Sequence, residues 1–155
     1  MNIARFRNIT MTQGGADAFV QTSEVTGIDP SSGRGWALRR AEIQFPQAAG
    51  LQGLSADSAI HWALTRDSKT AMSDLNDQDT IFAGGIFNAL TTSGEIALPS
   101  VHMHTFPDGI IVVEPTLYAH LDSAATGLTL TAHMRLFYEE VKLSEVEILR
   151  MLTQG

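Results

Sequence analysis

Apolar and polar residues alternate along residues 128–138, near the end of the 155-residue chain. Leucine, alanine, methionine and tyrosine side chains fall on one face of an extended backbone, and threonine, histidine, arginine and phenylalanine fall on the other. A period of two residues is typical of a strand with one face against a core. The pattern therefore predicts a long strand here, and the other strands are its expected partners.

The period changes after this strand, which predicts a short helix over residues 145–152. Ser144 and Glu147 have the spacing of a capping box, in which each side chain satisfies a free backbone N–H at the helix start. Leu143 and Ile148 occupy the positions of a hydrophobic staple. A helix this short needs packing to be stable in water. We expect it to dock either on its own domain or on a neighbouring subunit.

The rest of the chain predicts strands separated by loops rich in Gly, Pro, Ser and Asp. Residues 1–15 form an extended arm or an edge strand in this interpretation, and Pro107-Asp108-Gly109 is a turn that joins two strands as a hairpin. Residues 47–57 and 67–85 have no clear period and are expected to be loops. The predicted strands cover residues 17–26, 36–45, 58–66, 86–92, 96–105, 110–113 and 117–121. Roughly eight evenly spaced strands, with no helices between them, are typical of an all-β sandwich or barrel.

The length favours a single domain over residues 1–155, because either half alone would bury too little core. The chain has no cysteine, which excludes disulfides, thiolate metal sites and a cysteine nucleophile. It has no apolar run long enough for a transmembrane helix, and its first residues lack the apolar centre of a signal peptide. No membrane partner is therefore expected.

The formal charge of −7 is unevenly distributed along the chain. The part up to Arg66 has six basic and five acidic residues, and the remainder has four basic and twelve acidic. Basic residues cluster as Arg5 with Arg7 and as Arg34 with Arg39 and Arg40. An acidic chain does not bind nucleic-acid phosphates over its whole surface, so nucleic-acid cargo is not supported by the net charge. Arg5 and Arg7 remain the candidates for a local nucleic-acid contact.

His102 and His104 are the candidates for a metal site. Two histidines at positions i and i+2 of a strand point to the same face, so both imidazoles could reach one metal ion. Cupins, which are jelly-roll proteins, use a His-x-His pair in this way, but the glutamate that follows such a pair is absent at the required position here. His120 or His133 would have to be the third ligand, and spacing selects neither. Otherwise the pair faces solvent or a neighbouring subunit on an edge strand.

No other motif points to a cofactor or to catalysis. The sequence has no Gly-x-Ser-x-Gly elbow and no phosphate-binding glycine loop between a strand and a helix. Asp74, Asp77 and Asp79 resemble part of a calcium loop, but the central glycine and final glutamate are missing. We therefore expect no catalytic residues and no cofactor.

The late strands carry a resemblance to a known family. An apolar run ends at Val113-Glu114-Pro115, a turn lies at Thr126-Gly127, and a strand ending Arg135-Leu136-Phe137-Tyr138-Glu139 precedes Lys142-Leu143-Ser144 and the helix. This order resembles the last strands of single-jelly-roll capsid proteins of small icosahedral viruses, over residues 36–152. The resemblance implies an eight-stranded antiparallel jelly-roll sandwich with a short C-terminal helix. The chain departs from the family in lacking a long basic N-terminal arm.

The leading hypothesis is a structural protein that associates with itself as a capsid subunit and resides in the virion. Its contacts would come from the outward strand faces and the long loops. One alternative is a cupin-like metal-dependent enzyme that uses His102 and His104. Another is a trimeric jelly-roll module that binds a glycan or a receptor. Particles of very high mass would indicate the capsid subunit, bound metal would indicate the enzyme, and a small closed oligomer would indicate the binding module.

Overall fold

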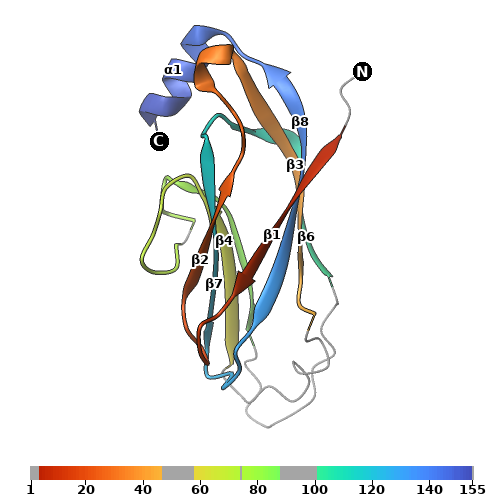
Figure 1. The fold of residues 1–155 in the computed structure, drawn as a ribbon, viewed down its shortest axis with the longest axis vertical. Coiled ribbons are helices and arrows are strands. Elements are labelled where there is room, and N and C mark those ends of the chain that lie inside the picture. The colour runs from red at the N-terminus through yellow and green to blue at the C-terminus, as the bar shows by residue number, and fades with distance from the viewer. Residues whose placement is uncertain (1–3, 47–57, 74, 88–100, 155) are drawn as a thin grey trace.

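The computed structural model describes residues 4–46, 58–73, 75–87 and 101–154. These residues form eight strands, one short 3-10 turn (η1, Pro30–Ser32) and one α-helix (α1, Glu145–Gln154) (Figure 1). The strands are β1 (Arg5–Thr12), β2 (Val20–Val25), β3 (Arg34–Gln44), β4 (Ala59–Thr65), β5 (Thr80–Phe87), β6 (Val101–Val112), β7 (Thr116–Ala124) and β8 (Thr131–Lys142).

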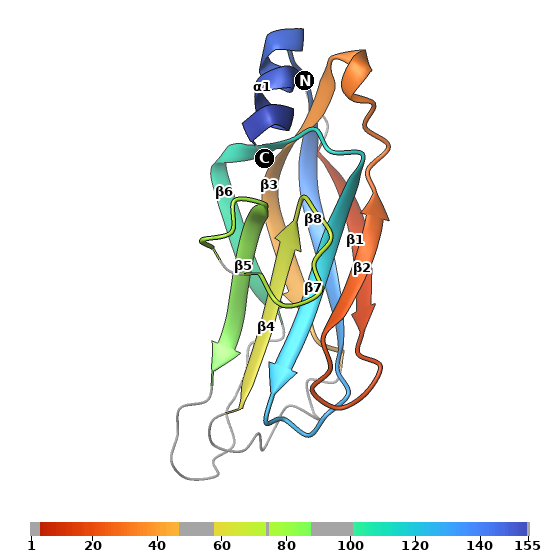
Figure 2. The ribbon, with the colours of Figure 1, turned by 90° about the vertical axis from the view of Figure 1, so that its left-hand side faces the viewer.

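The strands form two four-stranded antiparallel sheets packed face to face. One sheet has the order β1-β8-β3-β6, and the other has the order β2-β7-β4-β5. Figure 1 shows the two sheets as the layers of a sandwich, and Figure 2 shows the second sheet in front of the first. Consecutive strands alternate between the sheets, except for β4 and β5, which pair within the second sheet, and this arrangement is typical of a jelly roll. The predicted eight-stranded jelly-roll sandwich with a C-terminal helix is confirmed.

The core lies between the two sheets and follows the alternation in the sequence. On β8, Ala132, Met134 and Leu136 are fully buried, whereas His133 and Arg135 are exposed. On β4, Trp62 is buried against the first sheet. Because β8 is paired on both sides, by β1 and β3, the strand expected to be central is central.

The terminal helix begins where the capping box predicts. The Ser144 backbone N–H donates to the Glu147 carboxylate at 2.8 Å, and the Glu147 backbone N–H donates to the Ser144 hydroxyl at 3.3 Å. The first of these bonds, together with a bond of 2.8 Å from the Ser144 hydroxyl to the Glu147 carboxylate, lowers the pKa of Glu147. Ile148 is the buried side chain of the helix. The helix lies at one end of the sandwich, next to η1 (Figure 1), and continues to Gln154 rather than ending at 152.

The expected hairpin at Pro107-Asp108-Gly109 is wrong. Residues 101–112 form the single strand β6, and the three residues lie in an irregularity where Arg40 pairs with Thr105 while Leu38 pairs with Ile110. Arg39 donates from Nη1 to the Pro107 carbonyl at 2.9 Å across this irregularity. The long β3 offers pairing positions to both apolar runs, so the extra residues bulge instead of reversing the chain.

Strand β5 begins earlier than the pattern predicts. It covers Thr80–Phe87, whereas residues 67–85 were expected to be a loop and the strand was expected at 86–92. The run Ala83-Gly84-Gly85 hides the alternation, because glycine has no side chain to mark a face. Residues 88–92 of the expected strand, residues 96–100 of the next one and the expected loop 47–57 lie outside the described residues. At the other end of the chain, residues 5–12 are the edge strand β1, paired with β8 along its length.

Candidate assembly surfaces and charged sites

His102 and His104 both point inward from β6, into the gap between the sheets, rather than to solvent. The Trp62 indole N–H donates to Nε2 of His104 at 2.9 Å. Because Nε2 accepts this bond, His104 is neutral and carries its proton on Nδ1. The rings of His102 and Trp62 pack with their centroids 5.1 Å apart. The buried Nε2 atom of His102 has no hydrogen-bond partner among the described residues. Burial lowers the pKa of both histidines, and for His104 the neighbouring His102 lowers it further.

The two candidate third ligands lie away from this pair. His133 is on the outward face of β8, where it bonds the Thr10 hydroxyl at 3.0 Å. His120 is on β7 and bonds Thr65 on the adjacent β4. Within the described part of the chain, no three histidine, aspartate or glutamate side chains gather where they could hold a metal ion. The geometry instead makes His104 part of a hydrogen-bonded pair with Trp62.

Gly84 provides the space for this pair. A β-carbon at residue 84 would lie 2.7 Å from Cε1 of His104 and 2.7 Å from Nε1 of Trp62. Real side chains do not approach that closely, so any larger residue displaces the ring or the indole. The His104–Trp62 bond therefore depends on a glycine on the facing strand β5.

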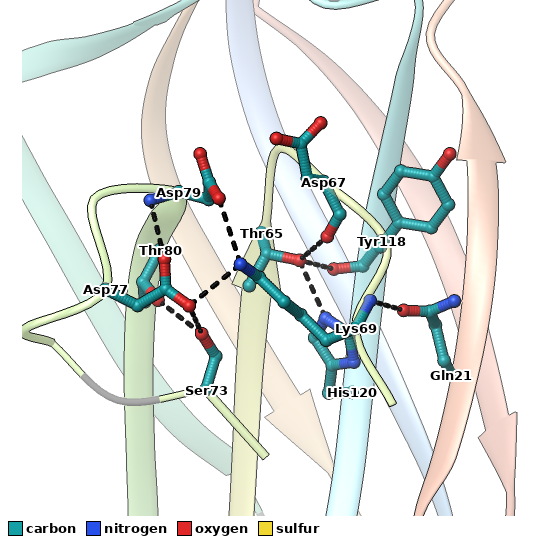
Figure 3. A network of polar contacts seen from close by, with 10 residues as sticks. All are labelled: Gln21, Thr65, Asp67, Lys69, Ser73, Asp77, Asp79, Thr80, Tyr118 and His120. Atoms are coloured by element: carbon teal, nitrogen blue, oxygen red, sulfur yellow. Dashed lines mark hydrogen bonds and ion pairs between the residues drawn. The ribbon is translucent and has the colours of Figure 1, made fainter. Parts of the chain in front are cut away.

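The acidic loop before β5 is held by a lysine. Lys69 Nζ lies 2.8 Å from the Asp77 carboxylate and 2.9 Å from the Asp79 carboxylate (Figure 3). The Lys69 ammonium, a backbone N–H and the Ser73 hydroxyl lower the pKa of Asp77 to about 2, and the two carboxylates raise the pKa of Lys69 to about 12. Asp74, the third acidic candidate, lies outside the described residues. Asp77 and Asp79 thus neutralise the ammonium group of Lys69, a residue of the same chain.

His120 lies beneath the same loop and is fully buried. Its Nε2 is 2.7 Å from the Thr65 hydroxyl, and its ring stacks on Phe19 with the centroids 5.5 Å apart (Figure 3 shows the contact with Thr65). Burial, followed by the positive charge of Lys69, lowers the pKa of His120 to about 4. His120 is therefore a neutral core residue at pH 7.

Arg5 and Arg7 lie on β1, with side chains that line one hollow together with Arg34 of β3. The sequence grouped Arg34 with Arg39 and Arg40, but the structure separates them. Arg39 forms an ion pair with Glu139, and Arg40 lies over the Phe137 ring at 4.1 Å. The strand register, which the sequence did not reveal, brings Arg34 close to Arg5 and Arg7.

The outward face of the β1-β8-β3-β6 sheet combines aromatic and basic side chains. Phe6 is 57% exposed and lies 6.4 Å from Phe137, measured between ring centroids. Arg135 covers Phe6 at 5.0 Å. Met103 on β6 adds a further exposed apolar side chain to this face. Aromatic residues, methionine and arginine are the residue types enriched in protein interfaces.

The terminal helix has an apolar stripe on its exposed side. Val146, Leu149 and Leu152 are spaced by three residues and are 74%, 61% and 45% exposed. Leu149 and Leu152 also line a groove of about 330 Å³ between α1 and Pro30 of η1. Ile148 anchors the helix to its own subunit, and the exposed stripe beside it offers an apolar surface to another molecule.

Comparisons with solved structures find the same fold in viral proteins. VP1 of Trichodysplasia spinulosa-associated polyomavirus matches with a TM-score of 0.56 and 6% identity, over 90% of this chain and 96% of that one. Chimpanzee polyomavirus VP1 matches with a TM-score of 0.54 and 7% identity, over 91% of this chain and 96% of that one. The unassembled KI polyomavirus VP1 pentamer matches with a TM-score of 0.51 and 8% identity, over 92% of this chain and 95% of that one. No protein-family model and no curated protein matches the sequence. The chain therefore has the jelly-roll fold of viral capsid proteins.

Proposed function

We propose that the chain is a self-assembling structural protein whose copies form a virion shell, with residues 1–155 acting as one jelly-roll domain. The observation that carries the proposal is the match to polyomavirus VP1 over nearly the full length of both chains. One of these structures is described as a pentamer. A homo-oligomer is the corresponding expectation for this chain, and the virion is its expected location.

The apolar surface of the subunit supports this proposal. Nine large apolar side chains among the described residues are exposed, and they come from both sheets, a loop and the helix: Phe6, Val25, Leu75, Phe87, Val101, Met103, Val146, Leu149 and Leu152. Stable assemblies bury large and fairly apolar areas. In the described part of the chain, β1 and β6 are the edge strands of one sheet, and β2 and β5 are the edge strands of the other. Edge strands are the elements of a sheet that can pair with another chain.

The metal-dependent alternative has less support from the geometry. His104 already uses one ring nitrogen for Trp62, and both predicted third ligands lie elsewhere in the sandwich.

Among the described residues, no helix has the length and hydropathy needed to span a bilayer.

Light scattering and negative-stain microscopy of the purified protein test the proposal. We expect particles far heavier than the 16.8 kDa subunit. A monomer or dimer under every salt and pH condition would refute it, and a trimer that binds glycans would favour the binding-module alternative.

A matched pair of helix variants tests which surface assembles. Leu149→Gln removes the centre of the exposed apolar stripe, so we expect fewer large particles at the same protein concentration. Arg150→Gln places the same residue at the neighbouring exposed position and should assemble as the wild type does. Equal assembly by both variants would exclude the helix stripe as a subunit contact.

A further inference from the structure

A hollow of about 520 Å³ opens between the start of β1, the start of β3 and the end of β8. Figure 1 shows these three strand ends at the same end of the sandwich as α1. The charged residues of its lining are Arg5, Arg7 and Arg34 against Asp29 and Glu140. The lining of the hollow thus has more basic than acidic residues, although the formal charge of the whole chain is −7.

The three arginines differ in how far their charge is already neutralised. Arg5 forms an ion pair with Glu140. Arg7 reaches Glu24 only at 4.0 Å, which leaves most of its donors unused. The guanidinium of Arg34 has no hydrogen-bond or ion-pair partner within the described residues and is exposed. Two of the three guanidinium groups therefore have free donors directed at one space.

The carboxylate of Asp29 uses one of its oxygens, Oδ1, for bonds to Ser31. It accepts the backbone N–H of Ser31 at 2.9 Å and the Ser31 hydroxyl at 2.6 Å, and both bonds lower the pKa of Asp29. The Oδ1 atom is occupied in capping η1. Glu140 is then the acidic group of the lining that a bound anion would displace from Arg5.

The aromatic side of the hollow holds Arg7 in place. Trp36 and Tyr138 stack with ring centroids 3.8 Å apart, and the Arg7 guanidinium lies over the Trp36 ring at 6.0 Å. Both rings are nearly fully buried and cannot move aside. An arginine held by a rigid aromatic surface loses less entropy when it binds an anion.

We propose that this hollow binds a phosphate group. Guanidinium forks match the oxygens of phosphate and bind them with charge-assisted hydrogen bonds. The source is either a free phosphate or phosphate monoester, or one phosphodiester of a nucleic-acid strand. A long strand laid across the surface would meet the negative charge of the remaining chain. The site belongs to a single subunit and does not depend on assembly.

Titration calorimetry with inorganic phosphate and with a short single-stranded oligonucleotide, each at constant ionic strength, tests the proposal. We expect saturable binding of at least one of the two probes. Arg34→Gln should weaken that binding about tenfold, because a hydrogen bond to a charged group is lost. Glu140→Gln should strengthen it, because Arg5 is released and a negative charge is removed.

The controls separate this site from general electrostatic attraction. Arg150→Gln and Glu145→Gln make the same charge changes on the exposed face of α1 and should leave affinity unchanged. Binding of phosphate alone identifies a free anion as the source, and binding of the oligonucleotide alone identifies a phosphodiester. Absence of binding to both probes, or equal affinity in the Arg34 and Arg150 variants, would overturn the proposal. A melting curve of each variant confirms that it is folded.

Discussion

Burial of His120 as a neutral side chain makes the stability of the subunit depend on pH. Its pKa is about 4 in the fold against an ordinary value of 6.5. The unfolded chain therefore takes up a proton at this residue before the folded chain does. Because the folded value is the lower one, the stabilisation is complete above pH 6.5. It is lost as pH falls from 6.5 to about 4, and it changes no further below that.

The size of the effect follows from the difference between the two pKa values. One pKa unit corresponds to about 1.4 kcal/mol, so the difference for His120 corresponds to about 3 kcal/mol of unfolding free energy. That is a large part of the stability of an ordinary domain, which is of the order of 5–15 kcal/mol. The structural cause is plain: the imidazole is fully buried, stacks on Phe19 and lies near the Lys69 ammonium.

Urea unfolding at a series of pH values measures this effect. We compare the wild type with His120→Gln, whose amide can still bond the Thr65 hydroxyl but does not titrate. The variant should be less stable at pH 7 and should lose less stability between pH 6.5 and 4. His133→Gln, at the exposed histidine of β8, is the matched control. Parallel pH profiles for the wild type and the His120 variant would refute the reasoning.

Three further substitutions have outcomes that the structure specifies. Gly84→Ala places a methyl group against His104 and Trp62 and should cost about 1–3 kcal/mol of unfolding free energy in a urea titration, as overpacking does. Trp62→Phe removes the donor to His104, so NMR titration should show a higher pKa for that histidine; an unchanged value would exclude the bond. Asp17 adopts φ of 56° and accepts two backbone and two hydroxyl bonds from Ser123, Thr126 and Gly127, which outweigh burial and lower its pKa to about 2. Asp17→Asn tolerates that backbone but removes the charge and replaces one acceptor oxygen with a donor NH2, so the melting temperature should fall at pH 7. The difference from the wild type should shrink as the pH falls from 3.8 to about 2, because Asp17 itself takes up a proton there.

The strand pattern predicted well wherever side chains mark the faces of a strand. The alternation in residues 128–138 and the capping box at Ser144 and Glu147 are local signals, and the structure confirms both elements, although the strand covers Thr131–Lys142. The strand β5 begins at Thr80 and not at the predicted residue 86, because two glycines interrupt its alternation. The false hairpin at residues 107–109 has a different cause: a Pro-Asp-Gly run favours a turn locally, but continuous pairing with β3 keeps both halves in one strand.

The fold class, the terminal helix and the identity of the polar side chains could be predicted from the sequence, because they depend on periodicity and on residue type. The contacts of those side chains could not be predicted, because they depend on how the strands pair and pack. His102 and His104 share a strand face, as the spacing predicted, but that face turns inward against Trp62. Arg34 joins Arg5 and Arg7 through the register of β1, β8 and β3. Neighbours of this kind come from pairing between distant strands, and no local pattern in the chain encodes that pairing.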